Sequence, residues 1–278
     1  MKNYPAKEWL SRLCSPGQIS LITSSRRSAV SEFPQSCVAA ADLSSCHVAF
    51  FTADLLRHDE MLGNIADEEH SFSLESYDGN PDDIRAACKE WFPDDRLPRY
   101  IVIEDFPYVM MHSPKDILAS PNSIVSWLES LRQVAEEYDA GVMVTARTNT
   151  IGDKTNDSEA DDLGKVDINE FVDTVAEIEE LDSRFRTYAI HMTCLDYSCE
   201  FLAFKQSFVG SEKGWERFVG VSEKIDDVKT DLAKAMKELE QEHRAVESDE
   251  QEIEFLEKWV KGDTEELQYL QKMKDTLD

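Results

Sequence analysis

The chain carries its clearest chemical pattern between Ser24 and Ser31, in the short polar stretch that follows its first apolar run. The spacing fits the frame GxxxxGK[ST] of a loop that binds nucleotide phosphates. In such a loop glycines let backbone amides approach, the lysine contacts the β and γ oxygens, and the hydroxyl binds Mg²⁺. Ser24 and Ala29 stand at the two glycine positions, Val30 at the lysine and Ser31 at the hydroxyl. The frame is therefore present, while most of the groups that would bind phosphate are missing.

Apolar runs on both sides of this stretch indicate the elements that would position it. Residues 19–22 form one run, an Ala-rich segment of helical length follows the polar stretch, and residues 48–51 form a second run. The order strand, loop, helix, strand is that of the βαβ unit that opens a nucleotide-binding sheet.

Further apolar segments predict a doubly wound, mostly parallel α/β sheet. Residues 99–104 and 141–146 are continuous apolar runs of the kind that is buried on both faces of such a sheet. The first of them ends in Glu104 and Asp105, which we expect to be strand-end acids in solvent. Helices are predicted at residues 6–13, where Trp9, Leu10 and Leu13 would cap the sheet edge, from Pro81 through Trp91, and at residues 121–137.

Five other segments are interpreted from the spacing of their apolar residues and from their composition. Residues 56–72 indicate a polar helix and loop, and residues 150–167 are Asp-rich and indicate a mobile loop. The alternating segments 172–181, 186–195 and 200–208 predict an antiparallel meander added to one edge of the sheet.

The C-terminal part has a seven-residue apolar repeat. It predicts two antiparallel helices, a coiled-coil hairpin over residues 213–278 that follows an α/β domain over residues 1–212. The first helix would have about 33 residues and extend about 50 Å. The hairpin either packs on its own domain or projects to bind a second chain; off the seam lie Phe255, Trp259 and Tyr269, which we expect to be exposed for protein contact. The repeat is made by Phe218, Ile225, Leu232, Leu239 and Val246, and then by Ile253, Val260 and Leu267 with Leu256, Leu270 and Leu277.

The formal charge of -28 on 278 residues bears on which kinds of partner the chain can bind. A polyanion is repelled by phosphate backbones, so direct nucleic-acid binding is disfavoured. The acidity itself indicates either plain solubility or a basic partner. No apolar run approaches the roughly 18 residues of a membrane span, and the start lacks a signal-peptide core. Six scattered cysteines fit reduced thiols, so we expect a cytoplasmic protein, or a nuclear one in a eukaryote.

The sequence can be examined for an anion site, a magnesium site and a zinc site. A helix N-terminus near Ser31 could hold an anion, but the side chains at the former glycine and lysine positions favour a turn without ligand. The strand-end acids lack the triphosphate that would complete a Mg²⁺ shell. His191 and Cys194 point to opposite faces of a strand, which argues against zinc shared with Cys199. We therefore expect no metal and no cofactor.

Together these segments resemble the RecA-like ATPase domain of DnaB-type replicative helicases and their RecA and KaiC relatives, over about residues 14–214. The resemblance implies a RecA-like fold and a tendency to assemble side by side in rings or filaments. It rests on the serial order of PGQISLIT, HVAFFTADLLRHDEMLGNIA, RYIVIEDFPYVM, AGVMVTARTNT and EFLAFKQSFVGSEKG.

The resemblance also assigns vestigial catalytic positions. The family's catalytic acid falls on Asp54, its Walker-B acid on Glu104 or Asp105, its sensor amide on Arg147, and its Lys-Gln-Arg element on Lys205-Gln206 followed by Ser207. Two departures are the loss of the phosphate-binding lysine and the acidic loop at the family's DNA-binding position. Without that lysine the β and γ oxygens lose a counter-ion on which phosphoryl transfer depends.

Three hypotheses follow. The first is a catalytically inactive scaffold or regulatory subunit that assembles with itself or with a RecA-like or basic protein, in DNA replication, repair or defence. The second is a divergent NTPase in which Arg26, Arg27 or Lys205 replaces the lysine and Asp54 remains the base. The third is an acidic mimic of nucleic acid that occupies a partner's basic groove.

Overall fold

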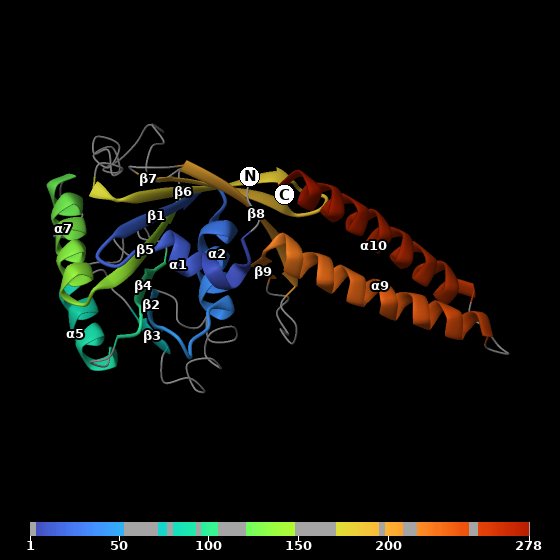
Figure 1. The fold of residues 1–278 in the computed structure, drawn as a ribbon, viewed down its shortest axis with the longest axis horizontal. Helices are drawn as coiled ribbons and strands as arrows, with labels where there is room; N and C mark the ends of the chain where they lie inside the picture. The colour runs from blue at the N-terminus through green and yellow to red at the C-terminus, as the bar shows by residue number, and fades with distance from the viewer. Residues whose placement is uncertain are drawn as a thin grey trace, which may run out of the picture.

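The computed structural model describes residues 4–52, 72–76, 80–92, 96–104, 121–147, 171–194, 198–207, 216–244 and 250–277. One twisted sheet with helices on both faces forms the body of the molecule, and two long helices project from one end of it (Figure 1). Among the described residues, no helix is both long enough and apolar enough to cross a bilayer.

The sheet has nine strands in the order β3-β2-β4-β5-β1-β6-β7-β8-β9. The six strands from β3 to β6 in this order pair in parallel, which confirms the predicted mostly parallel sheet. Every residue of β1 and β2 is buried, because helices cover both faces and the apolar runs can be continuous. The central strands are β1 (Ile19–Ser24), β2 (His47–Thr52), β4 (Arg99–Ile103) and β5 (Ala140–Arg147).

One face of the sheet is covered by α2 (Arg27–Ala40) together with η1 (Ala6–Glu8) and α1 (Trp9–Leu13). Trp9 stacks on Phe33 of α2 with their ring centroids 5.4 Å apart. Trp9, Leu10 and Leu13 therefore belong to the main core, and the prediction that they cap the sheet edge is wrong. The helix itself was predicted at these residues.

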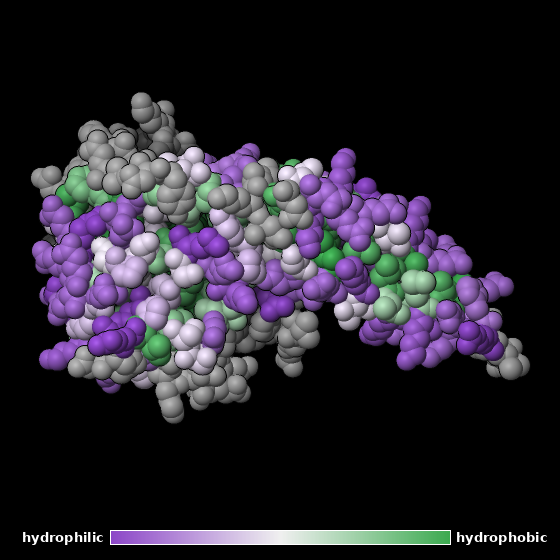
Figure 2. All heavy atoms as spheres, in the orientation of Figure 1, coloured by the Kyte–Doolittle hydropathy of each residue, from purple (hydrophilic) through white to green (hydrophobic). Residues whose placement is uncertain are grey.

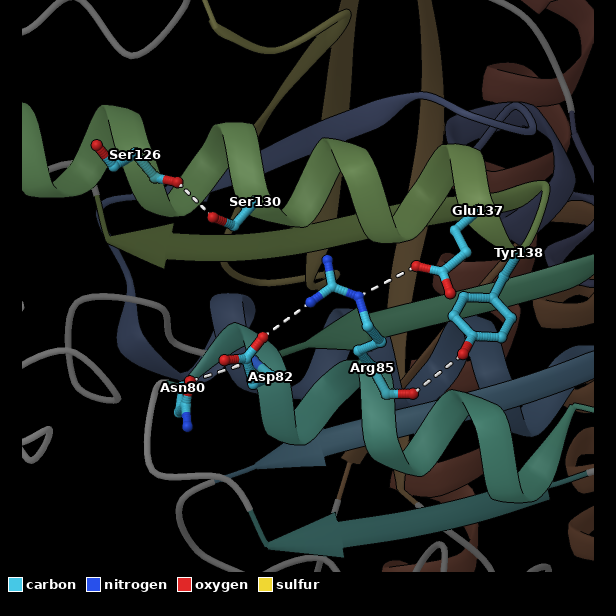
Figure 3. A network of polar contacts seen from close by, with 7 residues as sticks. All are labelled: Asn80, Asp82, Arg85, Ser126, Ser130, Glu137 and Tyr138. Atoms are coloured by element: carbon cyan, nitrogen blue, oxygen red, sulfur yellow. Dashed lines mark hydrogen bonds and ion pairs between the residues drawn. The ribbon is translucent and has the colours of Figure 1, made fainter.

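The other face is covered by α5 (Pro81–Trp91) and α7 (Pro121–Glu137). Asn80 caps α5 by accepting a hydrogen bond from the Asp82 amide. Arg85 forms an ion pair with Asp82 of the same helix (2.8 Å) and joins α5 to α7 through an ion pair with Glu137 (3.1 Å). The Tyr138 hydroxyl also donates to the Arg85 carbonyl oxygen (Figure 3). These exposed pairs orient the helices more than they stabilise them.

The predicted antiparallel meander is confirmed, since β6 (Thr174–Asp182) pairs antiparallel with β7 (Thr187–Cys194), and β7 pairs antiparallel with β8 (Ser198–Ser207). β6 joins the meander to the rest of the sheet by pairing in parallel with β1, and β9 (Glu216–Val219) adds one more antiparallel strand. β9 lies after the predicted boundary at residue 212, yet it belongs to the sheet. Phe218, expected in the helical repeat, is a buried residue of β9, because helical and strand spacings cannot be told apart at the end of an apolar repeat.

The projecting helices are α9 (Val221–Arg244) and α10 (Glu250–Leu277), which lie side by side and run in opposite directions (Figure 1). With 24 residues, α9 is shorter than predicted and about 36 Å long. The base of the pair joins the sheet in one apolar cluster, and hydrophobic residues continue along the pair within a mainly hydrophilic surface (Figure 2). The cluster consists of Leu202, Phe204, Val219, Val221, Ile225, Val228 and Leu270.

Two predicted segments need separate mention. β3 (Phe72–Ser76) is an edge strand that overlaps the end of the stretch expected to be a polar helix and loop, so that expectation is wrong for its last residue and missed the strand. The acidic loop at residues 150–167 lies outside the described residues.

Candidate functional site

The connection between β1 and α2 is short. β1 ends at Ser24 and α2 begins at Arg27, so only Ser25 and Arg26 link them. In a phosphate-binding loop the residues up to the lysine position wrap around the ligand. Here the residues from Arg27 to Val30 are helical instead, and the Val30 amide donates to the Arg26 carbonyl oxygen (3.2 Å). That amide is therefore used within the helix and does not face a ligand.

The side chains at the former glycine and lysine positions face the core. Ala29 is fully buried and Val30 is 1% exposed. A lysine ammonium at position 30 would have to leave water, which costs several kcal/mol without a partner. The apolar side chains of Ala29 and Val30 are therefore suited to these buried positions.

Glu104 forms the centre of a buried polar cluster with two hydroxyls. Ser31 Oγ donates to Glu104 Oε1, and Thr52 Oγ1 donates to Oε2 at 2.9 Å. Gln35 Nε2 donates to Ser31 Oγ at 3.3 Å. Because Glu104 is only 4% exposed, the expectation of a strand-end acid in solvent is wrong for this residue. The sequence analysis named Ser31 as the hydroxyl of the loop frame and Glu104 as a candidate Walker-B acid. It did not name Thr52 or Gln35.

The parallel register explains why these residues meet. Phe51 of β2 pairs with Ile103 of β4, so Thr52 and Glu104, one position further on, lie at the same end of neighbouring strands. Ser31 reaches them from the second turn of α2. Adjacent strand ends could have been paired from the sequence, had the strand order been known.

The cations near the connection contact carboxylates. Arg26 forms an ion pair with Glu180 of β6. Lys205 of β8 is buried and lies 2.5 Å from Glu32 of α2, with its ammonium 5.2 Å from the centre of the Phe218 ring. Neither of these predicted substitutes for the lysine is left without a counter-charge, and neither acid partner was anticipated.

Four further predicted positions are described in part or lie outside the described residues. Asp54 and Asp105 lie outside them. For Arg27 and Arg147 the backbone alone is described, and Arg147 pairs with Ser24 at the ends of β5 and β1. This register places Arg147, which the resemblance assigns to the sensor amide, beside the first residue of the Ser24–Ser31 stretch.

The histidine considered for zinc lies between two glutamates on the sheet. His191 Nδ1 is 2.9 Å from Glu200 Oε1, and its Nε2 is 3.2 Å from Glu179 Oε2. Within the described ranges, no three His, Cys, Asp or Glu side chains are grouped so that they could hold a metal ion.

The second candidate region lies on α10. Phe255 is 56% exposed and Trp259 is 37% exposed, and their rings form an edge-to-face pair with centroids 5.9 Å apart. Their predicted exposure is confirmed. Tyr269 differs, because its ring stacks on Phe185 at 4.4 Å and its hydroxyl lies 3.1 Å from that of Thr187. Tyr269 therefore anchors α10 to the β6–β7 turn, and its expected exposure is wrong.

Acidic groups lie beside this aromatic pair. Burial raises the pKa of Asp263, and the charges of Asp231 on α9 and Glu266 raise it further, while Lys224 and a hydrogen bond from Trp259 oppose the rise. Lys224 itself lies 3.0 Å from Glu266. Asp263 Oδ2 is buried and has no hydrogen-bond partner among the described residues.

Comparison with known proteins finds similarity in structure alone. No protein-family model matches the chain, and no curated protein matches it. Among solved structures, the chain is similar to an ATPase domain, with 9% sequence identity and a TM-score of 0.48 over 77% of this chain and 85% of that one.

Proposed function

We propose that this chain is a RecA-like α/β protein that does not hydrolyse nucleotide and acts through protein contacts, as a scaffold or regulatory subunit. The observation that carries the proposal is the β1–α2 connection of two residues, followed by a helix in which buried Val30 occupies the lysine position. A loop of this length has no free run of backbone amides to surround a triphosphate.

Electrostatics support the same proposal. Phosphoryl transfer needs positive charge that is positioned before the reaction starts. Among the described side chains, the carboxylates of Glu104, Glu32 and Glu180 lie near this connection, and the cations Arg26 and Lys205 contact two of them. A triphosphate would have to displace these contacts before gaining any of its own.

One observation favours the divergent-NTPase alternative. Ser31 and Glu104 remain in contact, and a hydroxyl beside a carboxylate is the pair that would hold Mg²⁺ in an active site. Under our proposal this pair is structural, since its partners Thr52 and Gln35 come from the same buried cluster.

The contact surface under this proposal is the α9–α10 pair, acting as a coiled-coil arm. It presents the exposed aromatic residues of α10 away from its base on the sheet. A partner from DNA replication, repair or defence, and assembly into rings or filaments, remain expectations from the sequence resemblance.

Calorimetric titration with Mg-ATP, combined with light scattering of the same sample, tests the proposal. We expect no heat of binding and no change in mass. ATP binding, ATP hydrolysis that is lost in Asp54→Ala, or a change in mass with Mg-ATP would refute the proposal in favour of the divergent NTPase.

A further inference from the structure

One side of α10 combines exposed aromatic rings with open space. Helical spacing places Glu252, Phe255, Trp259, Gly262 and Asp263 on this side, which we name the aromatic face. A Cβ built at Gly262 would meet no atom within 4 Å. The surface next to Trp259 is thus open, although glycine is a poor residue for the interior of a helix.

The negative charge at one end of the aromatic face is only partly balanced. Asp231 on α9 and Glu266 on α10 both raise the pKa of Asp263 through their charges, so three carboxylates act on one another here. The cation Lys224 is paired with Glu266. Asp231 is exposed, so it is the member of this acidic group that a cation from outside the chain can approach directly.

These features select the chemistry of an occupant. Exposed aromatic rings bind apolar side chains, and an indole ring also attracts a guanidinium or ammonium group. Unbalanced carboxylates beside the rings favour a cationic partner. A second copy of this chain carries a charge of -28 and would be repelled, and so would a nucleic acid.

We propose that the aromatic face binds a basic amphipathic helix of a partner protein. An Arg or Lys of that helix lies over the Trp259 ring, attracted by Asp231 and by the charge of Asp263, and its apolar side chains cover Phe255 and Trp259. The face runs from Glu252 to Asp263, about 16 Å, and so accommodates about three turns of the partner. This inference rests on the proposed function, because it names the kind of partner that the arm contacts.

The probe is a fluorescein-labelled helical peptide of 18 residues. It is made of leucine and arginine, with the leucines at helical spacing so that they lie on one side. Fluorescence anisotropy with the full chain in about 0.1 M salt, where long-range attraction is screened, measures the affinity. We expect saturable binding that Trp259→Gln weakens about tenfold and Asp263→Asn weakens about threefold, while Trp259→Phe retains most of it.

Two matched controls distinguish binding at the aromatic face from a general attraction of the basic peptide to an acidic protein. Met236 on α9 is 50% exposed, so Met236→Gln removes a comparable apolar side chain from the other helix and should leave the affinity unchanged. A scrambled peptide of the same composition should bind at least about tenfold more weakly. Circular dichroism and the melting temperature of each variant report that it is folded.

The inference is overturned by absence of saturable binding, by equal binding of the scrambled peptide, or by equal losses in Met236→Gln and Trp259→Gln. It is also overturned if light scattering shows a dimer that Trp259→Gln dissociates, since the occupant would then be a second copy. Nucleotide titration of the same preparation separates the two proposals. ATP hydrolysis with peptide binding intact refutes the proposed function alone, and loss of peptide binding without nucleotide binding refutes this inference alone.

Discussion

The β1–α2 connection and the aromatic face of α10 differ in whether their polar and aromatic groups are buried and paired or exposed to solvent. At the connection, Glu104 accepts two hydroxyl donors in the core, and Arg26 and Lys205 contact carboxylates of the same chain. On α10, the rings of Phe255 and Trp259 are exposed to solvent, beside the acidic group of Asp263, Asp231 and Glu266. The difference teaches that a sequence motif marks where a site could lie, whereas the burial and contacts of its side chains decide whether they are open to a ligand.

The largest effect is expected from restoring the missing lysine. Val30→Lys would place an ammonium at a position that is 1% exposed, so we expect a loss of about 3 kcal/mol or more in the free energy of unfolding. Urea denaturation measures it. Ala39→Lys in the last turn of α2 is the control and should change little, because cations are favoured there. A stable Val30→Lys variant that gains ATP binding would show that the connection can work as a phosphate-binding loop. The connection would then no longer differ from the aromatic face in being closed to ligands.

A smaller loss is expected at the carboxylate in the centre of the buried cluster. Glu104→Ala leaves the Ser31 and Thr52 hydroxyls buried without their acceptor, which we expect to cost about 2–3 kcal/mol. Thermal and urea unfolding of Glu254→Ala, an exposed change on α10, should differ from the parent by less than about 0.5 kcal/mol. If Glu104→Ala were as stable as the parent, the cluster would instead have the character of an active site kept at the expense of stability.

A substitution on the aromatic face is expected to increase the stability of the protein. Gly262→Ala adds a methyl group in open space and removes the conformational freedom of glycine from the unfolded chain, so we expect about 0.5–1 kcal/mol of added stability. The shift of the urea midpoint at constant slope reports it. A loss of stability would show that the space beside Trp259 is less open than the structure has it.

The smallest effect concerns pH. Because burial raises the pKa of Asp263 above the ordinary 3.8, the unfolded chain ionises this group at lower pH than the folded chain does. The folded state therefore loses stability as the pH rises from that value through the raised pKa. Asp263→Asn removes the loss, so the variant should exceed the parent by less than about 1 kcal/mol at neutral pH, since the group is partly exposed. The difference should vanish near about pH 3; a gain that persists there would have another origin.

The sequence predicted the elements whose pattern is local. β4 and β5 were predicted because strands buried on both faces are continuously apolar, and the predicted bounds of α7 match because its apolar period is regular. β3 was missed because an edge strand is short and tolerates the polar residues of FSLES. Phe218 was assigned to a helix because one apolar residue fits either period.

The candidate sites were predictable only as far as single segments define them. Phe255 and Trp259 were expected to be exposed because they lie off the helical seam. Tyr269 has the same pattern, but its partner Phe185 comes from a distant turn that no spacing on α10 could indicate. The burial of Glu104 likewise depends on strand order, which sequence pattern alone does not determine.

The projecting helix pair also governs how the molecule moves through solvent (Figure 1). α10 alone has 28 residues and is about 42 Å long, so the chain meets more hydrodynamic friction than a sphere of the same mass. A monomer should sediment slowly for its mass and elute early from a gel-filtration column. Calibration against globular standards would then overstate its mass, whereas light scattering, which does not depend on shape in this way, would return the true value.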